Sequence, residues 1–223
     1  MLKAIIFDMD GVLINSVWGI RKSFVKVFEE YGIDTEQFKT LHKEKYEGRT
    51  LSEQLQMRKE DLNIQQTLDP ITFSRKAFQY QLELEKDKYI PNPNILQLIQ
   101  EAKNKGIKIA VATSSAKERA ITLFTLVGIY DKLDAFVSCE EVIKGKPDPE
   151  SFLKTANLLN ISPENCVVIE DAMNGIQAAK SAGMKAIAKV KPERISEWFD
   201  QADLCFEDFK ELFLSDIEKL FIT

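Results

Sequence analysis

The chain has 223 residues, of which 44% are hydrophobic and 29% are charged, so it can bury a sizeable core and is neither a disordered nor a fibrous protein. Its 30 Lys and Arg residues are outnumbered by 35 Asp and Glu residues, and the formal net charge of −5 gives no positive field to hold a nucleic acid. No apolar run approaches the roughly 20 residues that a helix needs to cross a bilayer, so we expect no membrane association.

The first predicted element is a buried strand over Lys3–Phe7, which is short and apolar. Asp8 and Asp10 follow it directly, so this apolar start does not resemble a secretory leader and we expect a cytoplasmic protein. A helix is predicted from about Ser16, because apolar residues then recur at three- and four-residue steps until Gly32 ends the pattern.

The chain changes character between residues 34 and 88. This stretch is rich in Gln, Glu and Lys, contains no run typical of a buried strand, and places Phe73, Ala77 and Tyr80 at helical spacing. We interpret this stretch, together with the helix that starts at Ser16, as a small all-helical insert.

The alternation of short apolar runs with helices resumes after the insert. Pro91 and Pro93 start a helix that Gly106 ends. Strands are predicted over residues 107–112, 135–138, 166–169 and 186–190, and helices over residues 116–127 and 149–159. Because this alternation is typical of βα units, we expect an α/β fold with a Rossmann-like parallel sheet. The tail, residues 207–223, is predicted to form a closing amphipathic helix.

Polar side chains follow several of the predicted strands at the point where each strand ends. They are Asp8 and Asp10 after the first strand, Thr113, Ser114 and Ser115 after the second, and Glu170 and Asp171 after the fourth, with Lys146 in a loop before a helix. Because the carboxyl ends of parallel strands meet at one edge of a sheet, we expect these side chains to converge on one crevice.

So many carboxylates in one crevice call for a cation, because neighbouring like charges cannot all stay ionised. Oxygen ligands are those that the magnesium ion, Mg2+, prefers, and we expect it as the cofactor. Zinc is disfavoured because His42 is the only histidine and the three cysteines lack CxxC spacing. A histidine-dependent catalytic triad would depend on the same residue, which lies in a polar run, so we expect none.

Two carboxylates one residue apart can take different roles in phosphoryl transfer. Asp8 could attack phosphorus and form an acyl phosphate, while Asp10 protonates the leaving oxygen and then deprotonates the incoming water. Thr113 and Lys146 would bind the phosphoryl oxygens, because such reactions are catalysed mainly by positioning and electrostatics. Taken alone, each element also fits a plainer role, such as a turn, a helix cap or a solvated lysine.

Four segments together resemble the four motifs of the haloacid dehalogenase-like hydrolase superfamily: Asp8–Leu13, Ala112–Ser114, Lys144–Pro149 and Ile169–Ile176. Four ordered motifs that span the chain are a stronger signal than any single one. The chain is similar to the β-phosphoglucomutase-like branch, in which a helical cap is inserted between the first motif and the second strand. The resemblance implies a catalytic core of residues 1–15 and 89–223 and a cap domain of residues 16–88.

The resemblance also implies a role for each core residue. The catalytic roles fall to Asp8 as nucleophile, Asp10 as acid and base, Thr113 as phosphate-binding hydroxyl and Lys146 as phosphate-binding cation. The magnesium ligands would be Asp8, the main-chain carbonyl of Asp10 and Asp171, with Glu170 assisting. Ser114 and Ser115 are further phosphate-binding candidates.

The resemblance implies a phosphatase whose partner is a small phosphorylated metabolite. Asp10 argues against the superfamily's dehalogenases, which lack this second aspartate. Residues 15–20 contain no histidine, whereas sugar-phosphate mutases of the branch carry one early in the cap, so hydrolysis is favoured over a mutase reaction. A catalytically idle binding or regulatory homologue is the alternative outside enzymes. No apolar surface stripe indicates an oligomer, and we expect a monomer.

The cap segment Tyr46–Thr50 is the candidate for substrate choice. Gly48 permits a tight turn, and Glu47 and Arg49 supply charges of both signs that could face the crevice. The segment is similar to that of pyrophosphate-cleaving members of the branch, which makes inorganic pyrophosphate a candidate substrate. Glu47 and Arg49 fit a surface ion pair equally well.

Overall fold

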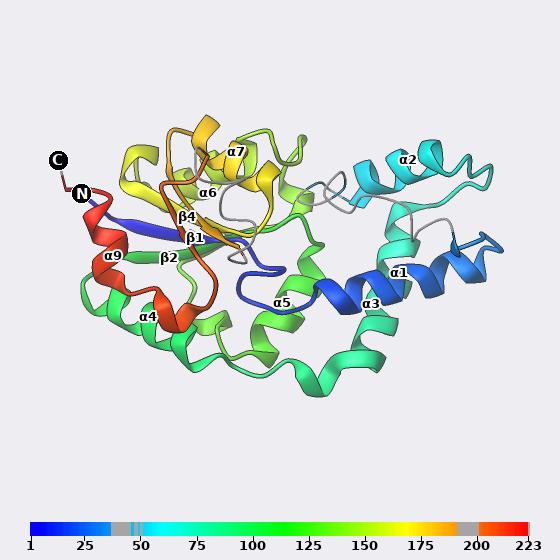
Figure 1. Ribbon diagram of the computed structural model, residues 1–223, viewed down its shortest axis with the longest axis horizontal. Helices are drawn as coiled ribbons and strands as arrows, with labels where there is room; N and C mark the ends of the chain where they lie inside the picture. Colours follow the sequence, from blue (N-terminus) through cyan, green and yellow to red (C-terminus); the bar gives the residue numbers. More distant parts are fainter. Residues whose placement is uncertain (37–45, 47–48, 50, 191–200, 223) are drawn as a thin grey trace.

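The computed structural model describes residues 1–36, 46, 49, 51–190 and 201–222, and its central element is a six-stranded sheet (Figure 1). The strands are β1 (Ala4–Phe7), β2 (Lys108–Ala112), β3 (Ala135–Val137), β4 (Cys166–Glu170), β5 (Lys185–Lys189) and β6 (Leu204–Phe206). They lie in the order β3-β2-β1-β4-β5-β6, and every neighbouring pair is parallel. This confirms the predicted α/β class with a Rossmann-like parallel sheet.

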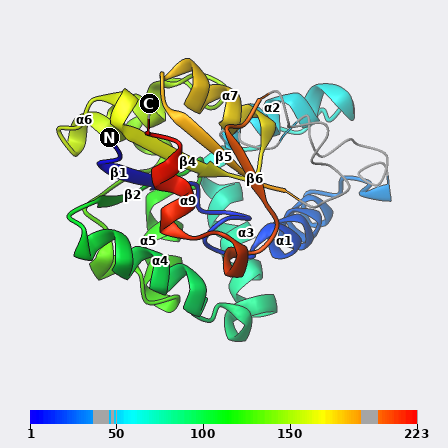
Figure 2. The ribbon, with the colours of Figure 1, turned by 60° about the vertical axis from the view of Figure 1, so that its left-hand side comes forward.

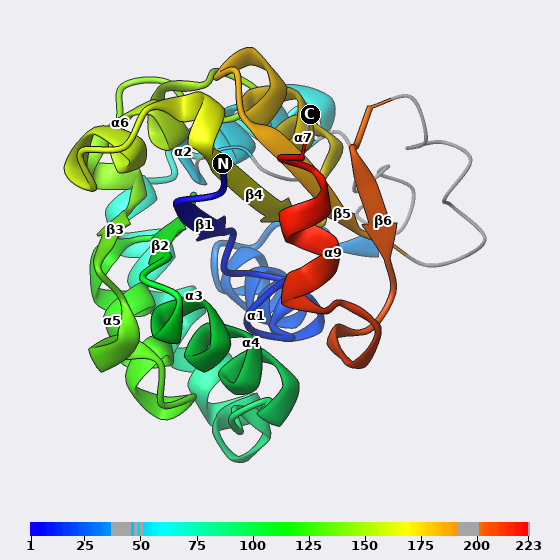
Figure 3. The ribbon, with the colours of Figure 1, turned by 90° about the vertical axis from the view of Figure 1, so that its left-hand side faces the viewer.

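The alternation of side chains along β1 divides the core into two layers. Ile5 and Phe7 belong to a hydrophobic cluster with α4 (Pro93–Asn104), α5 (Lys117–Leu126) and α9 (Leu214–Lys219). Ala4 and Ile6 belong to a cluster with α6 (Glu150–Leu158) and α7 (Met173–Ser181). Figures 2 and 3 show these two sets of helices on opposite faces of the sheet. Because helices cover both faces, β1 is buried on both sides, which explains its uninterrupted apolar sequence.

Three further helices have a hydrophobic cluster of their own. They are α1 (Val17–Glu30), α2 (Leu51–Asp61) and α3 (Pro70–Glu85), and they lie beyond the carboxyl end of β1 (Figure 1). Phe73 is at the centre of this cluster, with its ring centroid 4.8 Å from that of Phe28 and 5.1 Å from that of Phe24. The described residues between Ser16 and Lys88 thus form three helices and a 3-10 turn, and the assignment of this stretch as a separate insert stays a prediction.

The carboxyl-terminal tail differs from the single helix predicted over residues 207–223. Leu204–Phe206 forms the edge strand β6, a 3-10 turn follows at Phe209–Glu211, and α9 has only six residues. The Asp208 side chain accepts a hydrogen bond from the Lys210 N–H at 3.0 Å and caps the turn. The apolar residues of the tail thus belong to a turn and a short helix in succession. The strand β6, just before the tail, was not predicted, because three residues are too few for their periodicity to reveal a strand.

Short 3-10 turns at Lys86–Lys88, Tyr130–Lys132, Cys139–Glu141 and Pro163–Asn165 connect the remaining elements. Across the described ranges, no helix is both long and apolar enough to span a bilayer.

Candidate active site

The structure brings the predicted core residues together at the carboxyl edge of the sheet. Asp8 and Asp10 follow β1, Thr113, Ser114 and Ser115 follow β2, Glu170 is the last residue of β4, and Asp171 comes next. All of these residues line one cavity of about 770 Å³, which residues of α1, α2 and α3 line from the other side. Lys146 does not line this cavity, because it is buried behind Asp8 and Glu170.

Lys146 joins the ends of three strands. Its ammonium group donates hydrogen bonds to Asp8 Oδ1 at 2.6 Å, to Glu170 Oε1 at 2.7 Å and to the Ala112 carbonyl at 3.2 Å. Burial alone would lower the pKa of Lys146, but the Asp8 and Glu170 carboxylates raise it above its ordinary value. The lysine therefore stays charged although only 1% of its surface is exposed.

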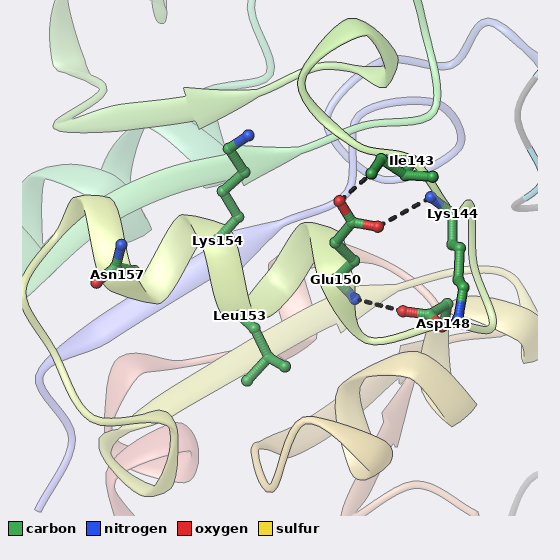
Figure 4. A pocket seen from close by; sticks show the side chains of 7 residues that line it. All are labelled: Ile143, Lys144, Asp148, Glu150, Leu153, Lys154 and Asn157. Carbon is green, nitrogen blue, oxygen red and sulfur yellow. Dashed lines mark hydrogen bonds and ion pairs between the residues drawn. The ribbon is translucent and has the colours of Figure 1, made fainter.

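Glu150, the first residue of α6, holds the loop that carries Lys146 (Figure 4). Its carboxylate oxygens accept hydrogen bonds from the main-chain N–H groups of Ile143 and Lys144, both at 2.9 Å. The Glu150 N–H in turn donates to Asp148 Oδ1 at 3.0 Å. Because these bonds fix the loop at both ends, the start of α6 helps to set the position of Lys146.

Asp8 is buried, and burial raises the pKa of its carboxyl group to about 7. The charge of Lys146 opposes this rise, whereas Glu170 and Asp10 add to it. Carboxylate oxygens of Asp8, Glu170 and Asp171 lie within 4.8 Å of one another. Three carboxylates beside one lysine leave negative charge that a hard cation with oxygen ligands can offset.

Two glycines make room for this acidic cluster. Gly11 has a φ of +84°, and a Cβ atom on it would lie 1.8 Å from Asp171 Oδ2. A Cβ atom on Gly175, in α7, would lie 1.8 Å from Glu170 Oε1. Glu170 Oε2 also accepts hydrogen bonds from the main-chain N–H groups of Asp171 and Ala172, at 2.8 and 2.7 Å. The cluster therefore depends on main-chain donors and on the missing side chains at both glycines.

The Asp10 carboxylate is fully engaged with neighbouring side chains. Arg119, in the first turn of α5, donates to Asp10 Oδ2 at 2.7 Å and to Oδ1 at 2.6 Å. The Ser115 hydroxyl donates to Oδ2 at 2.7 Å, and the Ser16 hydroxyl donates to Oδ1. Burial raises the pKa of Asp10, but the Arg119 charge and these hydrogen bonds hold it below its ordinary value. Asp10 is therefore held as a carboxylate.

Sequence reasoning missed Arg119, which is buried and lines the cavity. The available signal is its position in the first turn of the helix that follows Thr113–Ser115, at the edge of the sheet where the site forms. The first turn of a helix is an unfavourable place for a cation because of the helix dipole. An arginine in this turn therefore indicates an anionic partner outside the helix.

Thr113 and Ser115 contact each other at the end of β2. Thr113 Oγ1 accepts a hydrogen bond from the Ser115 N–H at 3.1 Å. Besides donating to Asp10, the Ser115 hydroxyl accepts a hydrogen bond from Arg119 Nη1 at 2.6 Å. Ser115 thus belongs to the surroundings of Asp10 in this structure, and the phosphate-binding roles of Thr113, Ser114 and Ser115 stay predictions.

Of the predicted cap residues, Arg49 lines the same cavity. Glu47 and Gly48, together with the single histidine, His42, lie outside the described residues.

Three more arginines of the helical part also line the cavity and were missed by sequence reasoning: Arg21 of α1, Arg58 of α2 and Arg75 of α3. The Arg58 guanidinium lies 4.0 Å from the centroid of the Tyr46 ring, and burial lowers the pKa of Arg58 to about 10. The helical side of the cavity thus carries several cations opposite the acidic edge of the sheet.

Known proteins share both sequence and fold with this chain. A family model described as haloacid dehalogenase-like hydrolase matches residues 5–189. The chain is 31% identical over 213 residues to a phosphorylated carbohydrates phosphatase of Thermotoga maritima, covering 87% of this chain and 96% of that protein. It is 34% identical over 185 residues to a Clostridium perfringens protein provisionally named as a pyrophosphatase, covering 83% of this chain and 82% of that protein. The solved structure of a β-phosphoglucomutase from Clostridium difficile is similar with a TM-score of 0.82 and 28% identity, covering 98% of this chain and 96% of that one.

Proposed function

Because the chain belongs to the haloacid dehalogenase-like hydrolase family, we propose that this phosphohydrolase is a magnesium-dependent phosphatase acting on a small phosphorylated metabolite. One observation carries the proposal. The Asp8 carboxylate faces the cavity with a buried lysine 2.6 Å from one oxygen and with the Glu170 and Asp171 carboxylates beside it. This arrangement combines a nucleophile, a fixed cation and an oxygen-rich metal site at one point.

The acidic cluster fits a magnesium ion, because its donors are hard oxygens close enough together to share one cation. Asp8, Asp171 and the main-chain carbonyl of Asp10 would hold the ion, with Glu170 assisting. When bound, magnesium supplies positive charge that stabilises the phosphoryl oxygens during transfer.

In the first step, an Asp8 oxygen attacks phosphorus and forms a new O–P bond, while the bond between phosphorus and the leaving oxygen breaks. Asp10 supplies the proton that an alkoxide leaving group needs, whereas a leaving group that is stable as an anion departs without it. Thr113 holds the phosphoryl oxygens. Lys146, already hydrogen-bonded to Asp8, offsets the charge that the phosphoryl group brings to that carboxylate.

In the second step, water attacks phosphorus and the bond between phosphorus and the Asp8 oxygen breaks. The Asp10 carboxylate takes the proton from this water, and Asp8 returns to its free carboxylate form. Phosphate is released. Arg119 and two hydroxyl groups hold Asp10 as a carboxylate, which supports its proposed role as the base in this second step.

We take residues 16–88 as a cap that covers the catalytic core of residues 1–15 and 89–223. Support comes from the separate hydrophobic cluster of α1 to α3 and from their place across the cavity from Asp8. A cap that closes over bound substrate would exclude bulk water, and its opening would release the product. The cations on its inner side favour an anionic substrate, such as a sugar phosphate or pyrophosphate.

The experiment is a measurement of phosphate release with magnesium from a panel of sugar phosphates, nucleotides, pyrophosphate, p-nitrophenyl phosphate and acetyl phosphate. We expect release from at least one compound, loss of that activity on chelation, and recovery when magnesium is added back. Isomerisation of a sugar phosphate primed by a bisphosphate, without net release, would instead identify a mutase. No turnover of any kind would indicate a catalytically idle homologue and overturn the proposal.

Replacing Gly11 with alanine should weaken metal binding more than it weakens the fold. The new Cβ atom would collide with the Asp171 carboxylate, so the apparent affinity for magnesium is expected to fall about 10-fold to 100-fold, as when the surroundings of other metal ligands are altered. The measurement is activity titrated against magnesium. Gly183→Ala is the matched control, because Gly183 has a similarly positive φ of +75° but no atom within 4 Å of its added Cβ. An equal loss in both variants would attribute the effect to backbone strain and contradict the prediction.

A further inference from the structure

Asp10 has no free acceptor position in this structure. A carboxylate offers about four lone-pair positions, two on each oxygen. Arg119 Nη2 and the Ser16 hydroxyl occupy Oδ1, while Arg119 Nη1 and the Ser115 hydroxyl occupy Oδ2. A hydroxyl group can rotate away to admit a water proton, but the paired guanidinium bonds fix the plane of the carboxylate.

Arg119 is itself held by a side chain from the helical part. Its Nε donates to Gln81 Oε1 at 2.9 Å, and the Gln81 side chain is 1% exposed, within α3. Gln81 Nε2 in turn donates to the Ser16 carbonyl at 3.4 Å. Since Ser16 directly precedes α1 and Gln81 lies within α3, the Gln81 side chain links both helices to the Arg119 guanidinium.

We propose that Arg119 is a positioning residue that orients the Asp10 carboxylate toward the attacking water, and that Gln81 ties this orientation to the seating of α3 against the sheet. The inference rests on the proposed function, in which Asp10 accepts the water proton while phosphorus leaves Asp8. Arg119 is suited to this role because a planar guanidinium matches a carboxylate with two parallel bonds, which a lysine cannot do.

This role separates the two chemical steps in a measurable way. Loss of Arg119 would misplace Asp10 and slow the hydrolysis of the aspartyl-phosphate. It would not slow the attack by Asp8 on a substrate whose leaving group needs no proton. The phosphorylated enzyme would therefore accumulate, and kcat would fall while kcat/KM stayed nearly constant.

The test compares the wild type with Arg119→Met, Arg119→Lys and Gln81→Leu, using whichever of p-nitrophenyl phosphate, acetyl phosphate and pyrophosphate the wild type cleaves fastest. For Arg119→Met we expect kcat to fall about 100-fold, the lower end of the usual contribution of a positioned base. We expect kcat/KM to change by less than about threefold and product to appear in an initial burst equal to the enzyme concentration. Arg119→Lys should recover part of kcat. For Gln81→Leu we expect kcat to fall about 10-fold while kcat/KM stays nearly constant. This variant keeps the test available if the Arg119 variants do not fold.

Lys117→Met is the matched control, because it removes a cation two residues away on the same helix whose side chain is 55% exposed and pairs with Glu141. It should leave both kinetic constants unchanged. A parallel fall of kcat and kcat/KM without a burst would show that Arg119 acts through the fold or through substrate binding, and would overturn the inference alone. A wild type without turnover of any panel compound would overturn the proposed function, and the inference with it.

Discussion

Replacing Asp8 with asparagine should abolish turnover while the fold survives. An amide does not attack phosphorus as a carboxylate does, so kcat is expected to fall by at least about 10⁴-fold, as when other enzymes lose their nucleophile. The fold should persist because asparagine has nearly the same shape and keeps an oxygen that can accept the Lys146 hydrogen bond. Lys146 also retains its ion pair with Glu170 at 2.7 Å.

The measurement is phosphate release from the fastest panel substrate, with the thermal unfolding temperature taken on the same samples. Asp131→Asn is the control, because the Asp131 side chain is 80% exposed and contacts Lys132 away from the cavity. A folded Asp8→Asn variant that keeps its activity would contradict the assigned nucleophile. An equal loss in Asp131→Asn would show that the effect is not specific to the site.

Replacing Lys146 with methionine should reduce both activity and stability. Without the ammonium group, the buried Asp8 and Glu170 carboxylates lose their shared counter-charge, at 2.6 and 2.7 Å. Breaking a buried pair in this way costs about 3–5 kcal/mol of the free energy of unfolding. Turnover is expected to fall about 100-fold to 1,000-fold, as when a preorganised charge-stabilising donor is removed.

The measurements are phosphate release for activity and denaturant unfolding, with and without magnesium, for stability. A bound cation would replace part of the missing charge, so we expect magnesium to stabilise Lys146→Met more than the wild type. Lys144→Met is the control, because the Lys144 side chain is 71% exposed and pairs with Asp148. Unchanged stability and activity in Lys146→Met would contradict the role of this lysine as the central cation of the site.

The residues that could be predicted from the sequence are those whose position follows from strand ends. Asp8, Thr113 and Glu170 come at the carboxyl ends of β1, β2 and β4, and the sheet brings them together whatever the helices do. Continuous apolar runs are what a parallel sheet covered by helices on both faces requires, so these runs indicate both the strands and the kind of sheet. The α/β class was confirmed for this reason.

The surroundings of Asp10 could not be predicted in the same way. Its contact with Arg119 joins residues 109 positions apart, and the contact between Arg119 and Gln81 joins residues 38 positions apart on two separate helices. Such contacts depend on the rotation and seating of helices, which hydrophobic periodicity leaves undetermined to within a residue or two. The same limit explains why the three arginines on α1, α2 and α3 were missed.

The tail shows a different limit. The helix predicted over residues 207–223 was wrong, because a 3-10 turn and a six-residue helix occupy this range and β6 lies just before it. Phe206, Phe209 and Leu212 recur at three-residue steps, which also fits a helix. In the structure these side chains reach the same hydrophobic cluster from a strand, a turn and the residue that follows the turn. The spacing of apolar residues indicates which of them are buried. It does not show whether a strand, a turn or a helix buries them, because this depends on how the chain packs at the edge of the sheet.

The central claim is that Asp8 carries the phosphoryl group between substrate and water. The most direct test is to mix the wild type with its fastest substrate and magnesium, quench with acid during the first turnovers, and analyse the peptides by mass spectrometry. We predict one phosphoryl group on the peptide that contains Asp8, and none on that peptide from Asp8→Asn. Rapid turnover with no phosphoryl group on Asp8, or with the group on another residue, would contradict the account.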